Sequence, residues 1–116
     1  MSRRIERINQ LIKKELGRIF LEEFDLPRDI LLTVMKVETT PDLLQAKIWL
    51  SVFPDSKRKE IFKILDKKKS KIRRFLGKKI ALKIMPRLEF LVDKSEEKRD
   101  TINRLLKEIK NGTKKT

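Results

Sequence analysis

The sequence predicts an α+β domain in which three amphipathic helices pack on a three-stranded sheet, in the order helix, strand, strand, helix, strand, helix. Three stretches repeat apolar residues at intervals of three and four, which is typical of helices buried along one side. Other stretches are rich in β-branched and aliphatic residues, as strands are. The 116 residues have the length of one domain. We assign residues 1–110 to this domain and the polar, lysine-ended residues 111–116 to a disordered tail.

The first helix is expected over residues 3–23, with Ser2 as its N-cap. Its apolar stripe consists of Ile5, Ile8, Ile12, Leu16, Ile19 and Phe20. The opposite face is basic and carries Arg3, Arg7, Lys14 and Arg18. Because Pro27 cannot continue a helix, the helix should end before the turn that contains it.

Two strands should follow, over residues 30–39 and 44–53. The second stretch alternates with a period of two, which indicates a half-buried strand. One face carries the apolar residues Leu44, Ala46, Ile48, Leu50 and Val52, and the other carries Gln45, Lys47, Trp49, Ser51 and Phe53. The connection Thr40-Pro41-Asp42 is typical of a tight turn. We therefore expect an antiparallel pair.

A long helix should begin at Asp55 or Ser56 and end at Gly77. Its buried stripe is interrupted, because continuing it from Leu65 places Lys68 at the next inward position. A local kink there would turn the lysines of residues 67–71 outward. Alternatively, the side chain of Lys68 extends past its neighbours to reach water.

The third strand is expected over residues 79–92. Pro86 lies inside it, which indicates an edge strand, a bulge or a break into two pieces. A last helix should begin after Ser95 as its cap. Its apolar stripe consists of Ile102, Leu105, Leu106 and Ile109.

The composition argues against an enzyme and against a resident cofactor or metal. The chain has no Cys and no His, so thiolate sites and the commonest general base are both absent. Its three glycines form no phosphate-binding loop. The N-terminus lacks the apolar stretch of a signal peptide, and no run of about 18 apolar residues exists. We therefore expect a cytoplasmic protein with no membrane partner, and nothing in the sequence demands more than a monomer.

Positive charge is concentrated in one region. The chain carries 31 Lys and Arg against 17 Asp and Glu, a formal net charge of +14. Residues 57–83 hold thirteen basic and two acidic residues, so they account for +11 and leave +3 elsewhere. A phosphate backbone is the partner that such a concentration favours. The predicted RNA-binding residues are Lys67, Lys68, Lys69, Lys71, Arg73, Arg74, Lys78 and Lys79, with Arg3, Arg4 and Arg7 as weaker candidates.

Two aromatic residues allow either a binding or a structural interpretation. Trp49 and Phe53 lie on the outward face of the second strand and could stack on a base. More often such a residue packs beneath a loop or a helix, and we favour that interpretation for Trp49. Because no pair of aromatics has the spacing of sheet-based RNA readers, a helix face is the better candidate for the RNA contact.

Several segments resemble the ribosome-binding factor A family over nearly the whole chain. They are RIERI at residues 4–8, LPR at 26–28, VETTPDLLQAKIWLSV at 37–52, IRRFLGK at 72–78 and MPRLEFLVDKS at 85–95. Each segment is moderately specific, whereas their order and spacing together are strong. The family has an Ala-x-Gly kink between two helices, where this chain has Lys68-Lys69-Ser70.

The resemblance implies a type II KH-like fold and a ribosome assembly factor that is not an enzyme. Such proteins bind the free small (30S) ribosomal subunit and assist late processing of 16S rRNA, including its 5′ end, and they are often tied to growth in the cold. The small subunit and its 16S rRNA are therefore the expected partners. The chain departs from the family at residues 68–70, where it adds two charges at the presumed RNA contact.

Two other classes of function remain open on the sequence. A DNA-binding regulatory protein could use the same basic helix, although it would need a second short helix packed before a recognition helix. A membrane-surface protein would need exposed aromatic anchors on a basic amphipathic helix. Phe62 and Phe75 are the candidates for such anchors, but the core has a prior claim on Phe75.

Overall fold

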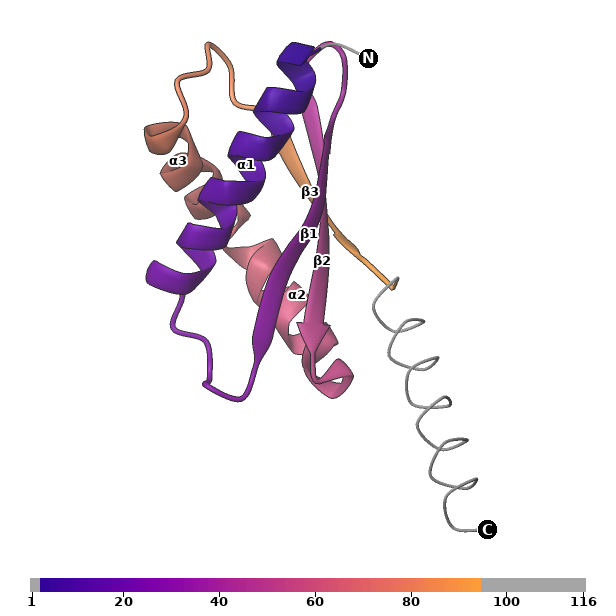
Figure 1. The fold of residues 1–116 in the computed structure, drawn as a ribbon. Coiled ribbons are helices and arrows are strands. Elements are labelled where there is room, and N and C mark those ends of the chain that lie inside the picture. Colours follow the sequence, from indigo (N-terminus) through magenta and orange to yellow (C-terminus); the bar gives the residue numbers. More distant parts are fainter. Residues whose placement is uncertain (1–2, 95–116) are drawn as a thin grey trace, which may run out of the picture.

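The computed structural model describes residues 3–94, and its first element follows the apolar stripe of the N-terminal segment. Helix α1 spans Arg3–Glu22. The stripe from Ile8 to Phe20 is buried as predicted, because residues three and four apart share one side of a helix. The helix packs on the sheet and lies beside another helix, α3 (Figure 1). The proposed cap Ser2 lies outside the described residues.

The next two elements form the expected antiparallel hairpin. Strands β1 (Leu31–Thr39) and β2 (Gln45–Phe53) pair from Leu31 opposite Phe53 to Thr39 opposite Ala46. The register shifts between Val34 and Lys36, which is a β-bulge. The predicted tight turn is confirmed, since the amide of Leu43 donates to the carbonyl of Thr40 over 2.9 Å.

The alternation along β2 separates two faces of the sheet. Ala46, Ile48 and Leu50 are fully buried beneath the helices, as the period of two predicts. Trp49 is half-buried on the opposite face, which fits the favoured packing interpretation, and Phe53 is exposed at the end of β2. Helices α1, α2 and α3 all lie on one face, so the described part is a two-layer α+β domain (Figure 1).

The central helix is divided, and it ends later than predicted. A short 3-10 turn over Asp55–Lys57 leads into α2 (Arg58–Lys67), and α3 (Lys69–Lys79) follows after a single residue. The prediction that Gly77 ends the helix is wrong, because Gly77 keeps a negative φ and the helix continues for two residues. Its missing Cβ matters for packing instead, since a Cβ there would lie 3.4 Å from Cγ of Met85.

The third strand is shorter than predicted. Strand β3 spans Arg87–Val92 and pairs parallel with β2, so β2 is central and β3 is an edge strand. Residues 79–86 are not part of it, because α3 extends to Lys79 and Pro86 cannot donate a ladder hydrogen bond. The predicted last helix and the tail at residues 111–116 lie outside the described residues.

Candidate nucleic-acid interface

The break between α2 and α3 occurs at Lys68, where the predicted buried stripe is interrupted. Lys68 has φ −98° and ψ 10°, far from the helical ψ of about −42°. Its amide donates to the carbonyl of Ile64, and its carbonyl accepts from the amide of Ile72, each over about 3 Å. The buried stripe therefore passes from Leu65 to Ile72 while Lys68 is exposed. Of the two alternatives that the sequence leaves open, the structure shows the kink that turns this lysine outward.

The two lysines at the break rest on aromatic rings. Nζ of Lys68 lies 5.3 Å from the ring centroid of Phe24, and Nζ of Lys69 lies 5.9 Å from that of Phe90. Phe20 joins the two rings, with centroids 5.5 Å and 6.5 Å away. Such a contact stabilises an exposed cation by roughly 0.5–1 kcal/mol. The lysine stems are thus held in place while their ammonium groups remain near water.

A basic row runs along the outward side of α3. Lys71, Arg74 and Lys78 are exposed and lie three to seven residues apart, so they share one face. Phe75 supports two of them, because Nζ of Lys71 and Nζ of Lys78 lie 5.7 Å and 5.9 Å from its ring centroid. We call Lys71, Arg74 and Lys78 the α3 row. Within residues 3–94, no carboxylate lies at ion-pair distance from this row.

Arg73 is placed differently from its neighbours. Its Nε donates to the carbonyl of Pro86 over 3.1 Å, and its Nη2 donates to the carbonyl of Met85 over 2.5 Å. The guanidinium therefore joins α3 to the segment that precedes β3. The sequence places Arg73 among the RNA contacts, and that assignment stays a prediction, while the structure shows that two of its donors are used within the fold.

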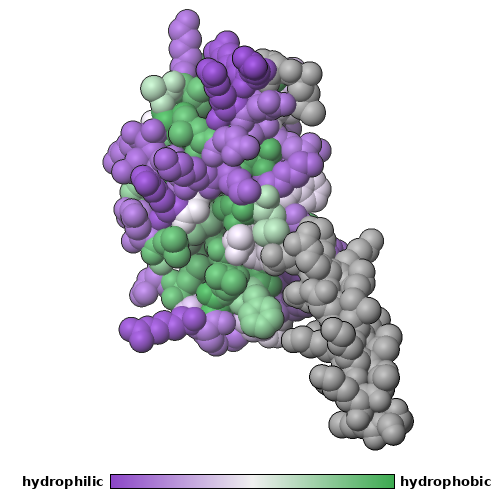
Figure 2. Space-filling model, viewed as in Figure 1, coloured by the Kyte–Doolittle hydropathy of each residue, from purple (hydrophilic) through white to green (hydrophobic). Residues whose placement is uncertain are grey.

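The other predicted residues are spread over the helical layer. Lys67 and Lys79 are exposed at the last residues of α2 and α3. Arg3, Arg4 and Arg7 are exposed on the first two turns of α1. With Lys14 they form a second basic surface that faces away from the sheet. Figure 2, drawn from the same side as Figure 1, shows hydrophilic side chains concentrated in the upper half of the molecule. Figure 1 places α3 and the first turns of α1 there.

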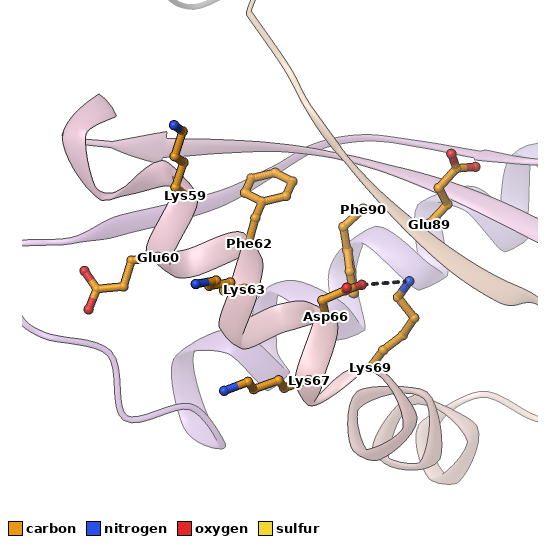
Figure 3. A pocket seen from close by; sticks show the side chains of 9 residues that line it. All are labelled: Lys59, Glu60, Phe62, Lys63, Asp66, Lys67, Lys69, Glu89 and Phe90. Carbon is orange, nitrogen blue, oxygen red and sulfur yellow. Dashed lines mark ion pairs between the residues drawn. The ribbon is translucent and has the colours of Figure 1, made fainter.

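A groove of about 910 Å³ lies between α2 and β3. Figure 3 shows Phe62 of α2 and Phe90 of β3 among its lining residues, with Lys69 paired to Asp66 at 3.2 Å. Carboxylates of Glu60, Asp66 and Glu89 line it together with four lysines. The groove is thus of mixed charge, unlike the α3 row. Sequence analysis missed it, because it joins residues 59–69 to residues 89–90.

Two features of the described residues bear on the other classes of function. No helix within residues 3–94 is long and apolar enough to cross a membrane. In that same part of the chain, no group of three or more His, Cys, Asp or Glu side chains could hold a metal ion. Phe62 and Phe75, the candidate membrane anchors, are partly buried against the core.

Comparison with known proteins places the chain in one family. The family model described as ribosome-binding factor A matches residues 4–106. The ribosome-binding factor A of Thermodesulfovibrio yellowstonii is 37% identical over 93% of this chain and 92% of its own length. That of Chlorobium phaeobacteroides is 40% identical over 95% of this chain and 97% of its own length.

Solved structures support the same fold. The solution structure of a putative ribosome-binding factor A from Thermotoga maritima is 28% identical, with a TM-score of 0.69, and the match covers 82% of this chain and 92% of that one. The crystal structure of the Thermus thermophilus protein has a TM-score of 0.67 at 22% identity, over 76% of this chain and 94% of that one. These matches confirm the KH-like fold that the resemblance implies. The chain belongs to the ribosome-binding factor A family.

Proposed function

We propose that this protein binds the free small ribosomal subunit through its 16S rRNA and assists late maturation of that RNA in the cytoplasm. The observation that carries the proposal is the concentration of charge, +11 in residues 57–83, a segment that contains two helices meeting at an exposed break. Phosphates attract such a surface at long range, and their condensed counterions are released on binding. A Thermus thermophilus homologue has been fitted as a model into a cryo-EM map of its complex with the 30S subunit.

The proposed contact combines the α3 row with the lysines at the helix break. Lys68 and Lys69 are held over phenyl rings, and two members of the row are held over Phe75. Cations that are already positioned lose less side-chain entropy when they meet a phosphate. The protein acts by binding, without a catalytic step, a cofactor or an obligatory second copy.

The proposal is tested by sedimenting the purified protein with free small subunits and, separately, with assembled ribosomes. The free subunit should be bound preferentially. If about five phosphates are neutralised, raising the salt from 50 to 200 mM should weaken binding at least a hundredfold. Equal binding to both particles, or to any nucleic acid of the same charge, would contradict the proposal.

The maturation role has a cellular test. Cells that lack the protein should accumulate 16S rRNA precursors with unprocessed 5′ ends, and their growth defect should be larger in the cold. Restoring the wild-type chain should remove the precursors, and a chain with the α3 row neutralised should not. Normal 5′ ends in the deleted strain would limit the function to binding.

The alternative, a DNA-binding regulator, fits the structure less well. A helix-turn-helix joins its helices by a turn of three to four residues, whereas α2 and α3 are separated by Lys68 alone. Competition decides between the two functions. An excess of duplex DNA should not displace the protein from small subunits at salt concentrations where excess rRNA does.

A further inference from the structure

The groove between α2 and β3 leaves apolar surface uncovered at the edge of the sheet. Phe62 and Phe90 are only partly buried, although both pack against the core. Strand β3 is an edge strand, so within residues 3–94 no further strand covers its outer side. In Figure 3 both phenyl rings lie between α2 and β3, while Lys67 points away from β3. An apolar segment that covered these rings would remove them from water.

The chain itself continues from this point. Strand β3 ends at Val92, two residues beyond Phe90, which corresponds to roughly 7 Å of extended chain. Twenty-two residues follow Lys94 in the sequence. Within them, Ile102, Leu105, Leu106 and Ile109 recur at helical spacing and need an apolar surface to cover them.

We propose that residues 95–110 dock as an amphipathic helix in the groove between α2 and β3, with their apolar stripe on Phe62 and Phe90. The stripe from Ile102 to Ile109 would be about 10 Å long, and the groove side of α2 and α3 from Lys59 to Lys69 about 15 Å. The lengths are therefore compatible.

Direction and charge agree with this placement. Strand β3 runs parallel to β2, and α2 starts shortly after β2 ends, so β3 ends near the start of α2. A turn at residues 93–95 would send the segment back along α2. Its acidic first turn, Glu96 and Glu97, would then lie beside Lys59 and Lys63 at the rim of the groove.

A tethered occupant is favoured over RNA and over a second copy. Three carboxylates lie among the four lysines of the groove, so its lining lacks the concentration of positive charge that an RNA strand favours. A segment attached a few residues away acts at an effective concentration in the millimolar range, which a separate molecule does not reach. The α3 row lies outside the groove, and of the residues in the proposed RNA contact Lys69 lines it. Docking and the RNA contact of the α3 row can therefore fail separately.

Paramagnetic NMR on the full chain tests the docking directly. Because the chain has no native cysteine, Lys107→Cys creates a unique site for a spin label on the predicted polar side of the segment. Amide signals of Phe62 and Phe90 should lose most of their intensity, while the indole signal of Trp49, on the other face of the sheet, should keep it. Leu106→Glu should restore the Phe62 and Phe90 signals. The matched control, Asn103→Glu, adds the same charge off the stripe and should leave them broadened.

Three outcomes would overturn the proposal. Undiminished signals at Phe62 and Phe90 would mean that the segment does not occupy the groove. Loss of the Trp49 signal instead would place the segment on the open face of the sheet. Broadening in a mixture of spin-labelled chains with separate isotope-labelled chains would show that a second copy is the occupant. If the groove signals are undiminished and a short single-stranded RNA then shifts them, the groove belongs to RNA.

Discussion

Arg73 and Arg74 are adjacent in sequence and differ in role. Arg73 donates from Nε and Nη2 to the carbonyls of Pro86 and Met85, whereas Arg74 is exposed in the α3 row. Arg73→Ala should lower the free energy of unfolding by about 1.5–3 kcal/mol, because two carbonyls lose charged donors. Arg74→Ala should leave stability unchanged and reduce the salt dependence of rRNA binding by about one phosphate. Urea unfolding and binding titrations separate the two effects, and equal stability of both variants would contradict this division.

Asn9 is a structural residue that the sequence pattern does not reveal. Its Oδ1 accepts from the amide of Thr39 over 2.9 Å and from the hydroxyl of Thr39 over 2.6 Å, which ties α1 to the end of β1. Thr39 is buried, so Asn9→Ala leaves two donors without a partner. The free energy of unfolding should fall by about 1–3 kcal/mol in urea titrations. The neighbouring exposed amide provides the control, since Gln10→Ala should change it by less than about 0.5 kcal/mol.

The β1–β2 turn predicts a local pH dependence. The hydroxyl of Thr40, at 2.6 Å, and then the amide of Leu44, at 3.0 Å, donate to Asp42 and hold the pKa of its carboxyl below the ordinary value. Because the folded-state pKa is the lower one, the stabilisation is present above the unfolded-state pKa, about 3.9, and is lost as the pH falls through the folded-state pKa. Thr40→Val should raise the pKa of Asp42 in an NMR titration. The pKa of Glu38, which is lowered by its hydrogen bond with Lys36, should not change in this variant.

Helix α3 gains from replacing the glycine inside it. Gly77 has ordinary helical geometry, and an added Cβ would meet only the flexible side chain of Met85 at 3.4 Å. Gly77→Ala should therefore raise the free energy of unfolding by about 0.5–1 kcal/mol, measured by thermal or urea unfolding. Gly17→Ala in α1 is the matched control, because its Cβ would meet nothing within 4 Å. A loss of stability in the α3 variant alone would show that residue 85 cannot move.

For the molecule as a whole, the two basic surfaces should contribute unequally to ribosome binding. Neutralising the α3 row as Lys71→Gln, Arg74→Gln and Lys78→Gln should weaken binding to small subunits much more than Arg3→Gln, Arg7→Gln and Lys14→Gln on α1. Both sets lower the net charge by three, so long-range attraction falls equally. Sedimentation at one salt concentration compares them, and equal losses would mean that net charge alone governs the binding.

Much of the architecture follows from local pattern. The stripe of α1, the alternation of β2, the hairpin turn and the interruption of the stripe at Lys68 could all be predicted, because each depends on residues within a few positions of one another. The concentration of positive charge and the family resemblance are likewise visible in the amino-acid sequence without a structure. These features point to an RNA-binding factor with a KH-like fold before any contact is known.

The remaining features depend on contacts between distant residues. Helix α3 ends at Lys79 rather than Gly77, and β3 starts only at Arg87, directly after Pro86, which cannot donate a ladder hydrogen bond. Ser70 replaces the glycine of the family kink without strain, because the break uses negative φ at Lys68. The hydrogen bonds of Arg73, the phenyl rings under Lys68 and Lys69, and the groove beside β3 each join residues 12 to 44 positions apart in the chain. No local propensity encodes such pairings, so only the folded chain, with its long-range packing in place, decides which basic residues are exposed and which are held within the fold.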